Sequence, residues 1–226
     1  MTIIHGENII ASRDKLIEII SKQKLENQEI IRLDAKDLTE AQLESVLGAN
    51  DLFETKKTIL IEGMHSLLKS AKQKMLIQMC NDSKLHEIIL WEKRKLTATM
   101  LKAFPAAQSY NFKASKTLFT WLDMLGRRGE ESKKIGLLHS AIANDGEFFC
   151  FLMLIRQFRL LIQAKSGEKI GGSSFMASKI QKQSQQFSLE QLLKTYSQLL
   201  EIDFCQKTSA NLLNMNQQLD LLTLKL

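Results

Sequence analysis

The sequence predicts an α/β domain followed by an all-helical domain, and three observations predict this architecture. In residues 1–112, short β-branched and apolar runs alternate with segments of helical periodicity. From residue 116 onward the strand pattern disappears and helical periodicity continues to residue 224. The apolar residues of the strand-like runs are consecutive, which is typical of parallel strands that are covered on both faces.

Five strand-like runs lie in the first half of the chain. They cover residues 2–5, 29–33, 58–62, 87–91 and 109–112. Three helical patterns separate them: one begins near Ile9, one follows a capping box of Thr39 and Gln42, and one covers residues 66–80. Because strands and helices alternate, we expect a parallel sheet with right-handed crossovers.

The second half of the chain contains helical patterns only. They cover residues 116–126, 130–143, 147–165, 175–186, 188–204 and 209–224. Residues 148–162 are apolar almost all round, so we expect this helix at the centre of a bundle. Ser188 and Gln191 form a second capping box. The predicted domains are 1–114 and 115–226.

The composition of the 226 residues is that of an ordinary soluble protein, with 44% hydrophobic and 25% charged side chains. No apolar run approaches the roughly 20 residues that a membrane-spanning helix needs, and the first residues lack a signal-peptide pattern. Three scattered cysteines, Cys80, Cys150 and Cys205, make neither a disulfide framework nor a metal knuckle. We expect a cytoplasmic protein, with Cys150 and Cys205 as buried free thiols.

The formal net charge is +6, and most of the excess lies in the second half. Residues 113–226 contain 15 basic and 10 acidic side chains, a net charge of +5. This excess permits a nucleic-acid partner without requiring one, because solvated surface lysines explain it equally well.

The first strand and helix do not carry a phosphate-loop pattern. Such a loop needs a second glycine and then a lysine, but Ala11 and Ser12 occupy those places. Glu7 would repel a phosphate group. Glu62 ends the third strand alone, where a magnesium-binding ATPase places paired carboxylates. We therefore expect no nucleotide site.

Other catalytic patterns are also missing from the sequence. A receiver domain needs an aspartate where Glu62 stands and a lysine after the fifth strand, where Lys113 is the first candidate. The four histidines have no metal-ligand spacing (His5, His65, His86, His139). No serine or cysteine lies in a nucleophile elbow. We expect no intrinsic catalysis, no metal and no cofactor.

Two segments carry a resemblance to a known family. Residues 50–61 contain the pair Leu52-Phe53, a short basic stretch and an apolar strand. Residues 151–161 contain Arg156-Gln157-Phe158-Arg159, and the following segment 177–187 is rich in Lys and Gln. In their order and spacing these motifs resemble the delta subunit family of the DNA polymerase III holoenzyme, a component of the bacterial clamp loader.

Weaker similarities extend over most of the chain. The turn Gly6-Glu7-Asn8 resembles the glycine-acid turn after the family's first strand. Residues 200–203 followed by Lys207 resemble its Leu-x-x-Asp and Lys pattern. The sequence departs from the family between the two domains. There the family has a small helical domain, whereas here Phe112 runs almost directly into residues 118–123. Trp121 could instead correspond to a tryptophan that opens the family's middle domain.

The resemblance implies a role in DNA replication without hydrolysis. In the family, an AAA+/RecA-like sheet domain without a phosphate loop presents a Leu-Phe wedge to a hydrophobic pocket on the beta sliding clamp. A helical collar joins the gamma/tau and delta prime subunits in a pentamer through which primed DNA passes. Here the wedge corresponds to Leu52 and Phe53. The residues alone favour the alternative, in which the pair packs beneath its own sheet.

The resemblance also suggests roles for two basic clusters. Lys93, Arg94 and Lys95 follow the fourth strand at the edge where parallel sheets place functional loops, so they are candidate DNA contacts or a solvated basic loop. Arg156 and Arg159 could contact nucleic acid or form ion pairs in the collar. We place Arg156, Phe158 and Arg159 in the collar core, with the two arginine head groups paired beside Phe158.

Two other functions remain compatible with the sequence. One is a degenerate AAA+-like adaptor that binds nucleic acid and has no clamp partner. The other is an enzyme that uses a nucleotide at a site without a known motif. Dependence of clamp binding on Leu52 and Phe53 would distinguish the clamp-loader subunit from the adaptor, and ATP binding would indicate the enzyme.

Overall fold

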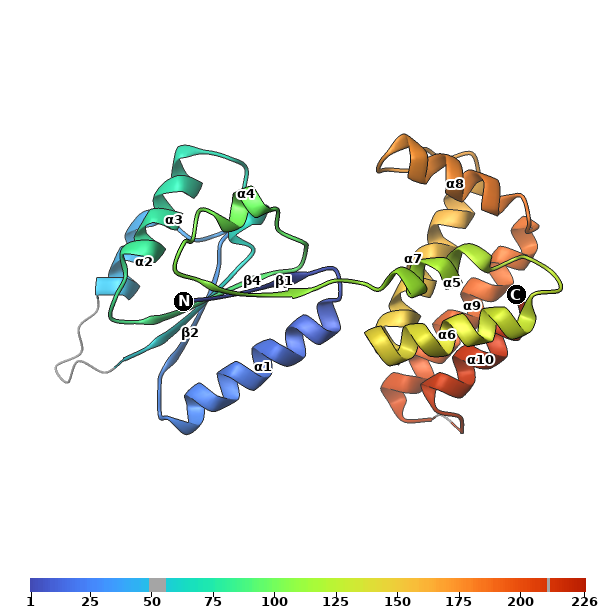
Figure 1. The fold of residues 1–226 in the computed structure, drawn as a ribbon, viewed down its shortest axis with the longest axis horizontal. Coiled ribbons are helices and arrows are strands. Elements are labelled where there is room, and N and C mark those ends of the chain that lie inside the picture. Colours follow the sequence, from blue (N-terminus) through green and yellow to red (C-terminus); the bar gives the residue numbers. More distant parts are fainter. Residues whose placement is uncertain (49–55, 211) are drawn as a thin grey trace. The chain divides into compact units, whose positions relative to one another are not determined.

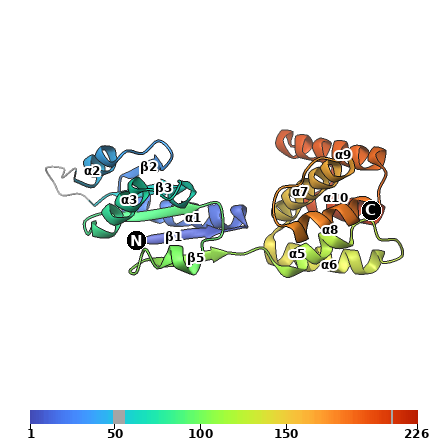
Figure 2. The same ribbon diagram turned by 90° about the horizontal axis from the view of Figure 1, so that it is seen from above.

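The chain divides into two compact units, Met1–Ala114 and Ser115–Leu226, which we name the sheet unit and the helical unit (Figures 1 and 2). The computed structural model describes residues 1–48, 56–210 and 212–226. Within these ranges, no helix is both long and apolar enough to cross a membrane.

The described residues of the sheet unit form a five-stranded parallel sheet with the strand order β2-β3-β4-β1-β5. Its strands are β1 (Thr2–Gly6), β2 (Ile30–Asp34), β3 (Thr58–Glu62), β4 (Glu87–Glu92) and β5 (Gln108–Phe112). β1 lies between β4 and β5: its Ile4 is in register with Trp91 of β4 on one side and Tyr110 of β5 on the other. The order differs from that of Rossmann and flavodoxin-like sheets.

Helices cover both faces of this sheet. They are α1 (Ile9–Leu25), α2 (Glu40–Gly48), the 3-10 helix η1 (Met64–Ser66), α3 (Ala71–Asp82) and the short α4 (Ala98–Leu101). Figure 1 shows α1 on one face and α3 and α4 on the other. Leu60 of β3 packs in the cluster under α1, while its neighbours Ile59 and Ile61 pack in the cluster under α2 and α3. The consecutive apolar residues of β3 therefore serve both faces, as the sequence predicted.

In the residues that the structure describes, the helical unit contains six helices. They are α5 (Lys116–Met124), α6 (Glu131–Asp145), α7 (Glu147–Lys165), α8 (Ser174–Ser184), α9 (Leu189–Thr208) and α10 (Met215–Lys225). α7 contacts each of the other five helices, and Leu154, Phe158 and Leu161 on it are fully buried. The central position predicted for this helix is confirmed, and so is the fold class.

Capping side chains set several helix boundaries. The capping boxes of Thr39 with Gln42 and of Ser188 with Gln191 are present. The predicted helix 66–80 is wrong at its start: α3 begins at Ala71, because the Ser70 side chain accepts a hydrogen bond from the main-chain N–H of Gln73.

The last helix also begins later than the predicted residue 209. α9 continues to Thr208, and α10 begins at Met215 because Asn214 and Gln217 form a further capping box. The sequence analysis did not weigh this box.

Three residues join the last strand to the first helix of the helical unit. β5 ends at Phe112, and α5 begins at Lys116 with the Ser115 side chain as its N-cap. The main-chain N–H of Ser115 also donates to Asp145 Oδ1 at 2.9 Å. Trp121 is fully buried on α5 inside the helical unit.

The three cysteines are free thiols. Burial raises the pKa of Cys80 to about 12, and burial together with the charge of Asp145 raises the pKa of Cys150 to about 12. Cys205 is only partly buried, so the expectation of a buried thiol is correct for Cys150 and too strong for Cys205.

Candidate functional site

The connection from β1 to α1 consists of only two residues, Glu7 and Asn8. Asn8 is the N-cap of α1: its Oδ1 accepts from the N–H of Ala11 at 3.0 Å, and its own N–H donates to the carbonyl of Phe112 at 3.0 Å. The amides that a phosphate loop would direct at its ligand are thus partly engaged within the chain. The connection is also too short to surround a phosphate group.

Gly6 permits a close approach between β1 and β5. Its φ of +145° lies in the region that favours glycine, and a Cβ atom there would lie 2.0 Å from the carbonyl oxygen of Phe112. Its N–H donates to the carbonyl of Arg94 at 3.1 Å. This glycine therefore serves packing between strands and not contact with a ligand.

A fully buried carboxylate ends β4. Oε1 of Glu92 accepts a hydrogen bond from the main-chain N–H of His65 at 2.6 Å. Burial raises the pKa of Glu92, while this hydrogen bond and the nearby Arg94 lower it. The guanidinium of Arg94 donates to the carbonyl of His65, so Glu92 and Arg94 together attach η1 to the end of β4.

The His5 side chain joins β1 to two neighbouring segments. Its Nδ1 accepts from the N–H of Leu96 at 3.2 Å, and its Nε2 lies 3.2 Å from Ser109 Oγ on β5. Burial lowers the pKa of His5, and the charges of Lys113 and Lys95 lower it further. The neutral ring, with an unprotonated Nδ1 that accepts the hydrogen bond, is therefore the form that fits this position.

Polar and charged side chains thus converge at the carboxyl ends of the strands without forming a metal site. In the part of the chain that the structure describes, no group of three or more His, Cys, Asp or Glu side chains could hold a metal ion. The hydrogen bonds of His5, Glu92 and Arg94 all lead to the chain itself. We interpret this edge as a network that fixes loops.

The basic run after β4 is only partly available to a ligand. Lys93 Nζ lies 3.4 Å from Glu62 Oε2 and 4.8 Å from the centre of the Trp91 ring. The head group of Arg94 is engaged in the contact described above. Lys95 is exposed and has no ion pair with any residue that the structure describes. Of the three predicted DNA contacts, Lys95 has the least engaged head group.

The pair Leu52-Phe53 lies outside the described residues, which resume at Lys56. Its role in clamp binding stays a prediction from the sequence.

The three residues assigned to the collar core occupy different environments. Phe158 is fully buried, with its ring centre 6.0 Å from that of Phe187. Arg156 and Arg159 are exposed and form no ion pair with a described residue. Their expected burial with paired head groups is wrong, because positions 156 and 159 lie on the helical face opposite to the one that packs.

That exposed face of α7 combines apolar and basic side chains. It consists of Phe148, Leu152, Arg156 and Arg159, which follow one another at spacings of four, four and three residues. Phe148 is 47% and Leu152 40% exposed. We name these four residues the α7 outer face. Large apolar residues combined with arginines are typical of protein–protein interfaces.

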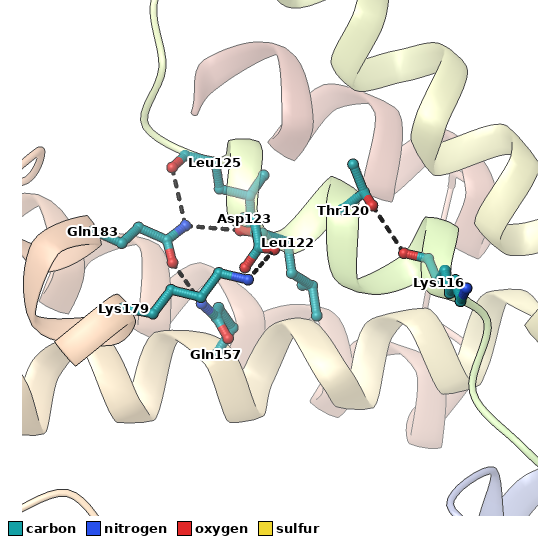
Figure 3. Close-up of polar contacts among 8 residues, drawn as sticks. All are labelled: Lys116, Thr120, Leu122, Asp123, Leu125, Gln157, Lys179 and Gln183. Atoms are coloured by element: carbon teal, nitrogen blue, oxygen red, sulfur yellow. Dashed lines mark hydrogen bonds and ion pairs between the residues drawn. The ribbon is translucent and has the colours of Figure 1, made fainter. Parts of the chain in front are cut away.

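Sequence reasoning missed the polar network that organises the helical unit (Figure 3). Gln157 Nε2 donates to Gln183 Oε1 at 2.6 Å, and both side chains are buried. Gln183 Nε2 donates in turn to the carbonyls of Leu122 at 2.7 Å and Leu125 at 3.1 Å, at the end of α5. Beside them Lys179 forms an ion pair with Asp123. The sequence feature that could have indicated this network is Gln157, a glutamine in the middle of an apolar helix.

The network connects three helices. Gln157 belongs to α7, Gln183 to α8, and the two carbonyls to the last turn of α5 and the residue that follows it. The carbonyls at a helix end have no partner within the helix, and here a side-chain amide provides one. The two motifs that carried the family resemblance in this half of the chain are therefore in direct contact.

A solved structure of the Bacillus subtilis DNA clamp loader delta protein (YqeN) is similar to this chain, with a TM-score of 0.45 and 11% sequence identity. The similarity covers 99% of this chain and 94% of that one. No protein-family model and no curated protein matches the sequence.

Proposed function

We propose that this chain is a non-catalytic clamp-loader subunit. In this proposal Leu52 and Phe53 bind the sliding clamp, and the helical unit joins the other loader subunits. The observation that carries the proposal is the contact between Gln157 and Gln183. It unites the Arg-Gln-Phe-Arg helix and the Lys- and Gln-rich helix, on which the resemblance to the delta family depends.

The β1–α1 connection supports the non-catalytic part of the proposal. Its two residues, the N-cap Asn8 and the close approach of Gly6 to Phe112 are features of a structural turn. A subunit that binds partners without hydrolysing a nucleotide requires nothing more of this segment.

The α7 outer face is the assembly surface that we propose for the other loader subunits. Phe148 and Leu152 supply exposed apolar area, and Arg156 and Arg159 supply cations without ion-pair partners among the described residues. Buried aromatic and arginine side chains contribute much of the binding energy of interfaces. On this proposal the two arginines find their carboxylate partners on a neighbouring subunit.

The experiment that tests the proposal is a pull-down of the beta sliding clamp of the same organism by the full-length chain. We expect specific retention of the clamp, and the delta prime and gamma/tau subunits should be retained through the helical unit. Absence of clamp binding, with nucleic acid still bound, would favour the adaptor without a clamp partner and contradict the proposal.

A further inference from the structure

A polar cavity of about 440 Å³ lies within the helical unit. The α5–α6 connection, the first turns of α9 and the end of α10 border it. Five cationic side chains line the cavity: Arg127, Arg128, Lys134, Lys194 and Lys225. They are one third of the 15 basic residues in residues 113–226, so the basic excess of this half is partly concentrated at one site.

These cations are poorly neutralised by the protein itself. Glu131 is the one carboxylate side chain in the lining, and its Oε1 is 4.0 Å from Nζ of Lys134. Five cations against one carboxylate leave an excess of four positive charges. A free carboxylate at Leu226, which also lines the cavity, would still leave an excess of three.

Some lysines elsewhere in the helical unit are neutralised by ion pairs. Lys133 pairs with Glu130 at 3.1 Å and Lys207 with Asp203 at 2.6 Å. By contrast, no residue in the described ranges forms an ion pair with the four cavity cations other than Lys134. The cavity therefore brings four cations of this kind together beside Lys134.

Lys134 makes the cavity unlike an exposed basic patch. Its side chain is 1% exposed, and its one ion-pair contact is at the outer limit of that interaction. A buried ammonium without a close partner is costly. An anion in the cavity would offset this cost and the mutual repulsion of the five cations.

We propose that this cavity binds a phosphate group, either of a small phosphorylated ligand or of a nucleic-acid strand. Phosphate oxygens accept several charge-assisted hydrogen bonds at once, for which arginine and lysine are the suited donors. Gln191, Thr195 and Gln198 add neutral donors in the same lining. The volume lies in the range of small-molecule sites, roughly 300–1,000 Å³. The proposal does not depend on a role in clamp loading.

The test is calorimetric titration of the full-length chain with inorganic pyrophosphate at low ionic strength. We expect saturable binding at one site and a higher melting temperature with pyrophosphate present. Lys134→Gln should weaken binding about tenfold or more, the usual effect of losing one charge-assisted hydrogen bond. Lys133→Gln, on the same helix but outside the lining, should leave binding unchanged.

Because Lys134 is buried, two exposed positions provide a second comparison. Arg128→Gln and Lys194→Gln should each weaken pyrophosphate binding, whereas Lys207→Gln, on the same helix as Lys194, should not. Without anion, Arg128→Gln should not lower the melting temperature, since it removes repulsion; a merely structural role would lower it. Absence of saturable binding, or equal weakening by the two control changes, would overturn the proposal.

A labelled single-stranded oligonucleotide distinguishes the two sources of phosphate. If a nucleic-acid strand supplies the group, the wild-type chain binds the oligonucleotide, pyrophosphate displaces it, and Arg128→Gln weakens the complex. If the chain binds pyrophosphate but not the oligonucleotide, the ligand is a small phosphorylated molecule. Both outcomes support a phosphate site.

Discussion

Gln157 Nε2 on α7 donates a 2.6 Å hydrogen bond to Gln183 Oε1 on α8, and this bond orients the Gln183 amide toward two carbonyls at the end of α5. An isolated buried glutamine is unfavourable unless its polar atoms are satisfied. Here the amide nitrogen of Gln157 and the amide oxygen of Gln183 satisfy each other. The pair consequently fixes the relative positions of three helices.

The first prediction concerns this pair. Gln183→Leu leaves the carbonyls of Leu122 and Leu125 without their buried donor, so it should destabilise the chain by about 1–3 kcal/mol. Gln157→Leu leaves one acceptor unsatisfied and should cost a similar amount. Gln183→Leu also leaves the Gln157 amide without its acceptor, and Gln157→Leu removes that amide. The double variant should therefore lose less stability than the sum of the two single losses. Urea denaturation of all three variants measures the coupling.

Gln181→Leu is the matched control, since Gln181 is an exposed glutamine on the same helix. It should change the free energy of unfolding by less than about 0.5 kcal/mol. Strict additivity of the two buried changes would show that the hydrogen bond contributes nothing to the helical unit.

The second prediction separates core from surface on α7. Phe158→Ala should destabilise the chain by about 3–5 kcal/mol, because the ring is fully buried against Phe187. Arg156→Ala and Arg159→Ala should each cost less than about 0.5 kcal/mol. If the α7 outer face binds other loader subunits, the same two changes should weaken assembly in a pull-down. A stability loss at Arg156 comparable to that at Phe158 would contradict the observed exposure.

The residues of α7 show how much of the helical unit could be predicted from the sequence. The continuous apolar pattern of 148–162 identified the central helix, and Phe158 is in its core. The same pattern could not show which face points outward, because apolar residues occupy nearly every position. The burial assigned to Arg156 and Arg159 was wrong for that reason, and Gln157 was overlooked although it lies between them.

In the sheet unit the strands were predictable and the polar edge was not. Consecutive apolar residues such as Ile59 and Leu60 identify a strand that is covered on both faces. The contacts of His5 with Leu96 and Ser109 join residues 91 and 104 positions apart, and no local pattern encodes such contacts. The start of α3 was misplaced because Leu67 and Leu68 continue the helical spacing, whereas the Ser70 cap fixes the boundary.

The third prediction concerns pH and His5. Burial, Lys113 and Lys95 lower the pKa of His5 in the folded chain below its ordinary value of about 6.5. As the pH falls, His5 is therefore protonated at a higher pH in the unfolded chain than in the folded chain. The stability from the neutral ring is complete above about pH 6.5 and is lost progressively as the pH falls through the folded pKa.

His5→Asn checks this sign, because an asparagine Oδ1 can still accept from the N–H of Leu96 and does not titrate. Denaturation between neutral and mildly acidic pH should show a steeper loss of stability in the wild type than in the variant. The difference in slope is at most about 1.4 kcal/mol per pH unit for one group. Parallel pH profiles of the two proteins would rule out a lowered pKa at His5.

The fourth prediction concerns nucleotides. Because Glu7 and Asn8 form a short capped connection in place of a phosphate loop, millimolar Mg-ATP should not raise the melting temperature through the sheet unit. A ligand present at 100 times its Kd would add about 2.7 kcal/mol, which is readily measured. The assay uses Arg128→Gln, so that the cationic cavity of the helical unit does not obscure the result. A reproducible rise of the same size in the wild type and in this variant would favour the nucleotide-using enzyme, because a rise that came from the cavity would be smaller in the variant.

The fifth prediction concerns clamp binding by Leu52 and Phe53. Burial of a leucine and a phenylalanine in a partner contributes roughly 3–6 kcal/mol before the costs of ordering, which is enough for an anchor. If the pair binds the clamp, Leu52→Ala with Phe53→Ala should abolish clamp binding and leave the melting temperature nearly unchanged. Affinity and melting temperature are measured on the same preparation.

The matched control for this pair is Leu25→Ala with Leu68→Ala. Leu25 is 85% and Leu68 88% exposed on the sheet unit, so this variant also removes two large apolar side chains, and it should still bind the clamp. A folded Leu52/Phe53 double variant that binds the clamp normally would eliminate the wedge. If that variant instead loses several kcal/mol of stability, the pair packs within its own unit, and any loss of clamp binding follows from unfolding.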